Sequence, residues 1–325
     1  MLLTLNVNSV RDKLSPRGKK KPMDILDVPS HASDELGLHG LLLNTGTLVG
    51  ATRSKLEKLR DRGDKTGCAC LVLAESDPLG FGEVSEDAGD AAVDRMLRVV
   101  QAASVLGCSS AAVSVKARDD EPSFERVVSR MQRVAELAER LEINVLLAPH
   151  PGLTADPAQA TALIKKIGGF RVGTMPDFLT AVGTDDAPGY LRRLTPFASA
   201  INATTQRFED PPEEPEAKPE PKDEKPEPEP AAVNAEGAAD AEPESAEPEL
   251  TGEAALLAEL EEMLGEEPPP PPVHTPYDLF PLVEAIKAVG YDQTLAIDFR
   301  GQGDSTLGVT RSREALEAAL EEASQ

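Results

Sequence analysis

Eight short apolar runs, separated by stretches with helical periodicity, organise most of this chain. The runs cover residues 3–10, 38–44, 68–75, 111–117, 144–149, 171–177, 197–203 and 294–300. The helical stretches cover residues 54–65, 91–106, 124–141, 157–167, 281–289 and 311–322, and a weaker one that contains Pro29 covers 23–36. Strands that alternate with helices form a parallel sheet. A doubly wound open sheet is the main alternative, but no GxGxxG motif follows the first run. Eight such units predict an α/β fold, a closed (β/α)8 TIM barrel.

Residues 209–272 interrupt the alternation and have a different composition. They hold 22 of the 57 acidic residues, only three Lys and 15 of the 28 prolines, and so carry −19 of the formal net charge of −24. Such a segment cannot bury enough apolar surface to offset the entropy of the chain. We therefore expect a long disordered, acidic, Pro/Glu/Ala-rich insert between strand seven and the last βα unit. Residues 1–208 would form strands one to seven, and residues 273–325 would complete the barrel.

One part of the insert has its own periodicity. Leucines and a methionine recur at helical spacing between Leu256 and Leu264, which predicts a short amphipathic helix over residues 253–264. This helix could fold onto its own domain, or it could dock into a groove of a protein partner. The sequence leaves both readings open.

The overall charge and the apolar pattern exclude several classes of protein. The excess of negative charge argues against nucleic acid, because binding to phosphates needs a clustered positive surface. No stretch approaches the roughly 20 apolar residues of a membrane helix, and the N-terminus lacks the pattern of a secretory signal. Three cysteines give no disulfide framework. We therefore expect a cytoplasmic protein without a nucleic-acid or membrane partner.

Polar residues end most of the predicted strands. In barrels of this kind the active site lies at the carboxyl ends of the strands. The polar residues at these ends are Asn6, Asn8, Asn44, Glu75, Lys116, His150, Asp177, Asn202 and Asp298. Together they predict a cleft for a small hydroxylated or phosphorylated molecule, although each one alone is also explained as a strand end that meets solvent. Gly301 and Gly303 lie just before the last helix, where glycines can bind phosphate.

Two stretches of the chain resemble a known family. AELAERLEINVLLAPHPGLTADPAQATALIKKIGGFRVGTMPDFLTA (135–181) resembles the middle of sugar phosphate isomerase/epimerase proteins, and LVEAIKAVGYDQTLAIDFRGQGDSTLGVTRSREALEAAL (282–320) resembles their last βα unit. These proteins belong to the xylose isomerase-like TIM barrel superfamily. The resemblance implies a small sugar, sugar phosphate or polyol as ligand at the carboxyl face of the barrel, and isomerase or epimerase activity.

The resemblance also implies a divalent metal such as Mn, Mg or Zn, held by carboxylates and histidines on strands five to eight. The metal would polarise a carbonyl group while two carboxylates exchange a proton beside it. Most of these positions differ here, because Ala148 replaces a glutamate, Thr180 replaces a histidine, and Asn202 stands where another histidine is expected. Asp177 matches a metal ligand, and Asp298 is shorter than the usual final glutamate. We therefore expect either no cofactor or a divalent metal at a degenerate site.

Two functions remain open at this point. If the protein is an enzyme, Asp298 or Glu75 would be the base, His150 the acid or electrophile, and Lys116 a cation that stabilises an enolate. The residues expected to bind the substrate are Asn8, Asn44, Asn202, Gly301 and Gly303. The alternative is a non-catalytic barrel that binds a ligand or acts as a scaffold through its acidic insert. Ala148, which removes a carboxylate, favours this alternative.

Overall fold

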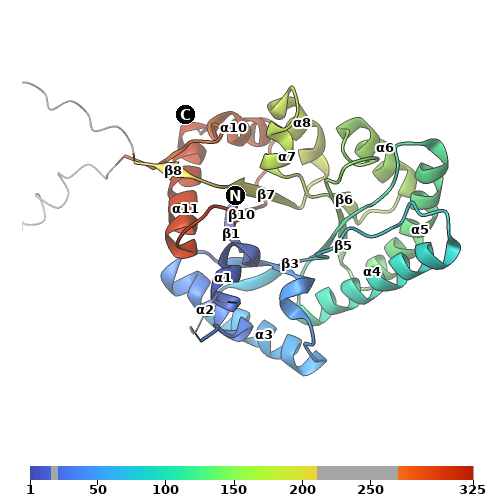
Figure 1. The fold of residues 1–325 in the computed structure, drawn as a ribbon, viewed down its shortest axis with the longest axis horizontal. Helices are drawn as coiled ribbons and strands as arrows, with labels where there is room; N and C mark the ends of the chain where they lie inside the picture. The colour runs from blue at the N-terminus through green and yellow to red at the C-terminus, as the bar shows by residue number, and fades with distance from the viewer. Residues whose placement is uncertain (16–20, 211–269, 325) are drawn as a thin grey trace, which may run out of the picture. The chain divides into compact units, whose positions relative to one another are not determined.

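A computed structural model describes residues 1–15, 21–210 and 270–324 (Figure 1). One compact unit is built from Met1–Asp210 and Pro271–Gln325. Residues 211–269 of the predicted insert, including the helix predicted over 253–264, lie outside the described residues. Within the described ranges, no helix is long and apolar enough to cross a membrane.

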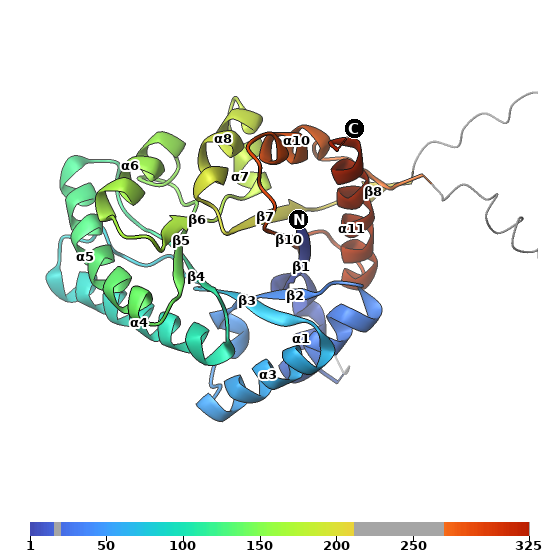
Figure 2. The same ribbon diagram turned by 180° about the vertical axis from the view of Figure 1, so that it is seen from behind.

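Eight parallel strands of the described chain form one curled sheet, seen as a ring in Figure 2. In chain order they are β1 (Leu2–Asn6), β2 (Gly40–Asn44), β3 (Ala69–Ala74), β4 (Ser110–Ser114), β5 (Asn144–Ala148), β6 (Val172–Thr174), β7 (Ala200–Thr205) and β10 (Thr294–Phe299). Neighbours in the sheet follow the order β6-β5-β4-β3-β2-β1-β10-β7. Two isolated parallel bridges, Thr174 with Ala198 and Asp177 with Asn202, join the two ends of this order and close the ring. The predicted TIM barrel is therefore confirmed.

Helices surround the ring on its outer side (Figures 1 and 2). They are α1 (Arg11–Leu14), α2 (Val28–Ser30), α3 (Arg53–Thr66), α4 (Glu86–Leu106), α5 (Glu121–Arg140), α6 (Pro157–Ile167), α7 (Phe178–Val182), α8 (Ala187–Leu194), α10 (Phe280–Ala288) and α11 (Ser305–Glu322). A separate antiparallel pair, β8 (Phe208–Glu209) with β9 (Val273–His274), lies where the chain leaves and re-enters the described part.

Local sequence signals set the ends of the long helices. The side chains of Ser85 and Asp120 accept hydrogen bonds from backbone N–H groups in the first turns of α4 and α5, which makes them N-caps. Gly67 and Gly107 end α3 and α4 in the left-handed conformation, with φ of 66° and 76°. Glycine adopts this conformation without the steric penalty of a Cβ atom, so each helix stops just before the next strand.

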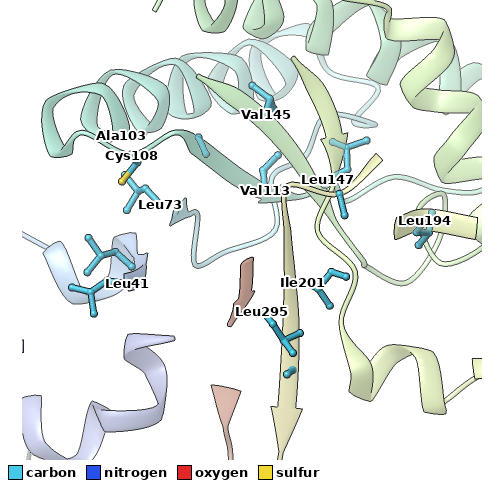
Figure 3. Packing of buried hydrophobic residues seen from close by; sticks show 14 of the residues in the cluster. Leu41, Leu73, Ala103, Cys108, Val113, Val145, Leu147, Leu194, Ile201 and Leu295 are labelled. Atoms are coloured by element: carbon cyan, nitrogen blue, oxygen red, sulfur yellow. The ribbon is translucent and has the colours of Figure 1, made fainter. Parts of the chain in front are cut away.

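The strands divide the core into two layers, because successive side chains point to opposite faces. Outward-facing residues such as Leu41, Leu73, Val113 and Ile201 pack between the strands and the helices (Figure 3). The inner layer is smaller and consists of Leu42, Val72, Ala74, Ala112, Leu146, Met175, Ala200 and Ala296. Since half of these inner residues are alanines, the inside of the barrel is lined by small side chains.

Several predicted boundaries were wrong. The first strand stops at Asn6, because the Asn6 side chain accepts a hydrogen bond from the Asn8 N–H and caps a 3-10 turn over Val7–Val10. The weak helix predicted over 23–36 consists of short helical turns and the three-residue α2. Two helices between β6 and β7, α7 and α8, were not predicted, because each is under ten residues long.

Candidate functional site

A chain of asparagine side chains crosses the carboxyl end of the barrel. Asn44 Nδ2 donates to Asn6 Oδ1 at 3.1 Å, and Asn6 Nδ2 donates to Asn202 Oδ1 at 3.0 Å. Asn202 Nδ2 then donates to Asp298 Oδ2 at 3.0 Å. All four residues are buried, and they come from β2, β1, β7 and β10. The structure therefore brings together four of the predicted strand-end residues.

Asp177 lies beside this chain and is held by neutral donors. Thr204 Oγ1 donates to Asp177 Oδ1 at 2.5 Å, and Thr180 Oγ1 donates to Oδ2 at 3.3 Å. The Leu179 N–H donates to Oδ1 at 3.3 Å, because Asp177 is also the N-cap of α7. Burial raises the pKa of Asp177 above its ordinary value, and the Thr204 hydroxyl only partly opposes that shift. Asp177 is therefore a buried carboxyl group whose charge is costly.

Asp298 carries a direct counter-ion. Arg300 donates to Asp298 Oδ2 through Nε at 2.8 Å and through Nη2 at 2.6 Å. Burial by itself lowers the pKa of Arg300, but the charges of Asp298 and Asp177 outweigh it and raise that pKa. Asp298 Oδ1 is buried and has no hydrogen-bond partner in the described part of the chain. The carboxyl end of the barrel, which we call its mouth, thus contains an ion pair in which one carboxylate oxygen has no hydrogen bond.

The side chain of Glu75 points toward the surrounding helices and not into the barrel. The sequence predicted it as a possible base in the cleft, but its Oε2 accepts a hydrogen bond from Arg95 Nε of α4 at 2.7 Å, and its Oε1 accepts one from Thr45 at 3.0 Å. Ala74 faces the interior, so the next side chain turns toward the helices. Glu75 still touches the cavity described below, but its carboxylate is bound on the helical side.

Two predicted catalytic residues lie outside this cluster. Lys116 is mostly exposed and its Nζ lies 3.5 Å from Glu83 Oε1. His150 Nδ1 lies 2.9 Å from the Pro151 carbonyl oxygen. Among the described residues, neither lines the cavity at the barrel mouth. The structure therefore does not bring Lys116 and His150 together with Asp177 and Asp298.

The predicted glycine site lies in a neighbouring hollow. Gly301 and Gly303 line a depression beside the loop after β1, and Asn8 lines both this depression and the cavity at the mouth. A Cβ atom on Gly301 would lie 1.9 Å from the Gln206 carbonyl oxygen. The close approach of the two backbones thus explains Gly301 without a phosphate.

The cavity at the mouth has a volume of about 200 Å³. Its polar side is formed by Asn6, Asn44, Asn202, Asp298 and Arg300. Small or apolar side chains from the inner layer also line it, namely those of Leu42, Ala74, Ala112, Ala148 and Met175, together with Ser114 at the end of β4. Arg300 was the last residue of a predicted strand but was not named as a site residue. Its charge at a strand end was the signal that could have identified it.

The divalent metal implied by the resemblance does not fit the residues present. Ala148 and Asn202 occupy two of the expected ligand positions, and the carboxylate of Asp298 is already bound by a guanidinium. No group of three or more His, Cys, Asp or Glu among the described residues is arranged to hold a metal ion. The guanidinium of Arg300 also places a positive charge at Asp298, where it would repel a divalent cation and compete with it for the carboxylate oxygen.

Comparisons with known proteins place this barrel in a family. Residues 32–206, more than half of the chain, match the family described as xylose isomerase-like TIM barrel. The chain belongs to this family. A search of curated proteins found no match.

Solved structures share the fold at low sequence identity. An L-ribulose 3-epimerase has a TM-score of 0.68 at 11% identity, with 100% of this chain and 96% of that chain covered. The IOLI protein, described with a binding zinc atom, has a TM-score of 0.65 at 12% identity, with 99% of each chain covered. D-Psicose 3-epimerase from Clostridium cellulolyticum H10, described with D-tagatose, has a TM-score of 0.62 at 12% identity, covering 100% and 98%. These likenesses establish the fold, and their sugar chemistry belongs to the named proteins.

Proposed function

We propose that this chain binds a small polyhydroxy compound, a sugar or polyol, in the mouth of its barrel without a divalent metal. The observation that carries this proposal is the hydrogen-bonded chain of Asn44, Asn6 and Asn202, which borders a cavity of about 200 Å³. Amide groups offer both donors and acceptors, and hydroxyl groups can exchange with either. The epimerases of similar fold act on sugars, which supports the same class of ligand here.

Binding is favoured over catalysis because the ionised groups are already engaged. Glu75 is bound by Arg95, and Asp298 is bound by Arg300. One observation supports a second candidate, an isomerase or epimerase without metal: Asp298 Oδ1 has no partner in the described chain and could accept a proton. Deuterium incorporation from heavy water into a bound sugar would support this candidate. A scaffold role of residues 253–264 stays a prediction from sequence alone.

A thermal-shift screen tests the proposal. Aldoses, ketoses, polyols and sugar acids of three to six carbons are added to the full chain, with and without a chelator. At least one compound is expected to raise the midpoint of unfolding equally with and without the chelator. Asn202→Ala is expected to abolish the shift, because it removes the link between Asn6 and Asp298. Asn144→Ala, at the amino end of β5, is the matched control and should leave the shift intact.

Metal addition gives the second arm of this test. Ala148→Glu restores the carboxylate that the family resemblance implies, but Arg300 still engages Asp298 in this variant. We expect no saturable Mn²⁺ binding by calorimetry in either the wild type or Ala148→Glu. Saturable binding by the wild type, or a ligand shift that requires metal, would contradict the proposal.

A further inference from the structure

Arg300 is the single guanidinium among the described residues that line the cavity at the mouth. It follows β10, and its backbone N–H donates to the Thr205 carbonyl oxygen at 2.8 Å, which fixes the start of the side chain. The side chain is 45% exposed, whereas the carboxylate that it binds is 1% exposed. Arg300 is therefore held through its backbone N–H and through one edge of its guanidinium, while part of the side chain stays exposed.

The anchoring uses only part of the guanidinium. Nε and Nη2 both donate to one oxygen, Asp298 Oδ2. Nη1 forms no hydrogen bond with the residues that the structure describes. A guanidinium is planar and carries five N–H groups, so the edge formed by Nη1 and Nη2 remains available. This edge only donates hydrogen bonds, and its two parallel N–H groups match the two oxygens of a carboxylate.

The charges around the cavity are compatible with an added anion. Of the three carboxylates of the described lining, Glu75 is paired with Arg95 and Asp298 with Arg300. Asp177 is the third, and its charge is stabilised by two hydroxyls and one backbone N–H. Burial also raises the pKa of Asp177, so this group takes up a proton more readily than an exposed carboxylate when a second negative charge arrives.

We propose that the free edge of Arg300 binds a carboxylate of the ligand, so that the ligand of this barrel is a small polyhydroxy acid and not a neutral sugar. The hydroxyl groups of such an acid would meet the asparagine chain, and the apolar side with Ala112 and Ala148 would hold its carbon skeleton. This inference rests on the proposed function, because it specifies the ligand class of the same cavity.

Calorimetry with matched pairs of probes tests the inference. The pairs are glycerate with glycerol, erythronate with erythritol, and gluconate with glucitol, at pH 7 and constant ionic strength. The two members of each pair have the same number of carbon atoms. The full chain is expected to bind the acid of at least one pair tenfold more tightly than the alcohol. Equal affinities within every pair would overturn this inference and leave the proposed function standing. Binding of no probe would overturn both.

Three variants separate a direct contact from a general effect of charge. Arg300→Gln is expected to remove the preference for the acid and to keep the affinity for the alcohol. Arg300→Lys keeps the positive charge without the planar fork, so an intermediate preference is expected, and this variant retains a partner for Asp298 if Arg300→Gln fails to fold. Arg53→Gln removes a charge from an exposed arginine of α3 and should change nothing. A tenfold preference that persists in Arg300→Gln would overturn the inference.

Discussion

The two sides of the barrel mouth are built from the same kind of strand end but differ in chemistry. On the side of β1, β7 and β10, the inward positions carry Asn6, Asn202 and Asp298, which bind one another. On the side of β3, β4 and β5, the inward positions carry mostly alanines, namely Ala74, Ala112 and Ala148, with the hydroxyl of Ser114 at the end of β4. The first side supplies fixed polar groups and the second supplies space. A cavity with both features can orient a small polar ligand and still admit it.

The largest effect is expected on the polar side, at Thr204. Its hydroxyl donates to Asp177 and accepts from Asn202 Nδ2 at 3.2 Å, so Thr204→Val breaks two bonds and removes the closest donor of a buried carboxylate. Hydrogen bonds to charged groups contribute more than neutral ones, so the free energy of unfolding should fall by about 2 to 3 kcal/mol. Urea unfolding measures this change.

Thr205→Val is the control for Thr204→Val. Thr205 is equally buried, but its hydroxyl lies 2.7 Å from Ser312 Oγ on the outer side of the same strand. The loss of this neutral hydrogen bond should cost only about 1 kcal/mol. Equal losses for the two variants would mean that the polar network at the mouth adds no special stability.

The alanine side should affect binding more than stability. Ala148→Leu places three more carbon atoms beside the cavity without touching the asparagine chain. The affinity for the compounds found in the thermal-shift screen should fall at least tenfold, which corresponds to about 1.4 kcal/mol. The free energy of unfolding should change by less than about 1 kcal/mol, since the new atoms enter existing space. Ala148→Ser keeps the size and should retain binding, and an unchanged affinity in Ala148→Leu would place the ligand elsewhere.

The alternation of runs along the chain was enough to predict the barrel, but only part of its mouth. Asn44 and Asn202 lie at the cavity, because inward positions at strand ends converge in any closed barrel, and their role in binding stays a prediction. The direction of Glu75 was not predictable in the same way. The pairing of β2 with β3 shifts register between Leu41 and Leu42, and this irregularity changes which residues face inward. A count of alternating residues along one strand does not reveal such a shift.

The ion pair between Arg95 and Glu75, on the helical side of the strands, gives a smaller test of the contrast between the two sides of the mouth. Arg95 is 42% exposed and binds the buried carboxylate of Glu75 on the helical side of the barrel. Arg95→Ala leaves Glu75 with the hydroxyl of Thr45, so we expect a loss of about 1 kcal/mol in the free energy of unfolding, reduced by the exposure of the arginine. Ligand affinity should not change. A fall in affinity as large as that of Arg300→Gln would show that Glu75 acts on the cavity side.

The pH dependence of stability gives the smallest expected effect. It isolates Asp177, the one carboxylate of the described cavity lining that has no ion pair with an arginine or lysine. The raised pKa of Asp177 means that the folded state holds its proton more tightly than the unfolded state. Asp177 therefore lowers stability progressively as the pH rises from its ordinary value of 3.8 to the raised value, and the penalty is complete above that. Asp177→Asn should remove this component, so the stability of the variant relative to wild type should increase with pH across that window.

Asp24→Asn supplies a control of opposite sign for Asp177→Asn. A hydrogen bond from the Leu26 N–H lowers the pKa of Asp24, which is exposed, lies before α2 and does not line the cavity at the mouth. Its contribution to stability is present above the ordinary pKa and is lost as the pH falls through the lowered value. Urea unfolding of the three proteins between pH 2.5 and 7.5 gives both difference curves. Curves of the same sign would mean that the folded protein stabilises Asp177 as an anion. The polar side of the mouth would then carry a negative charge close to the bound ligand.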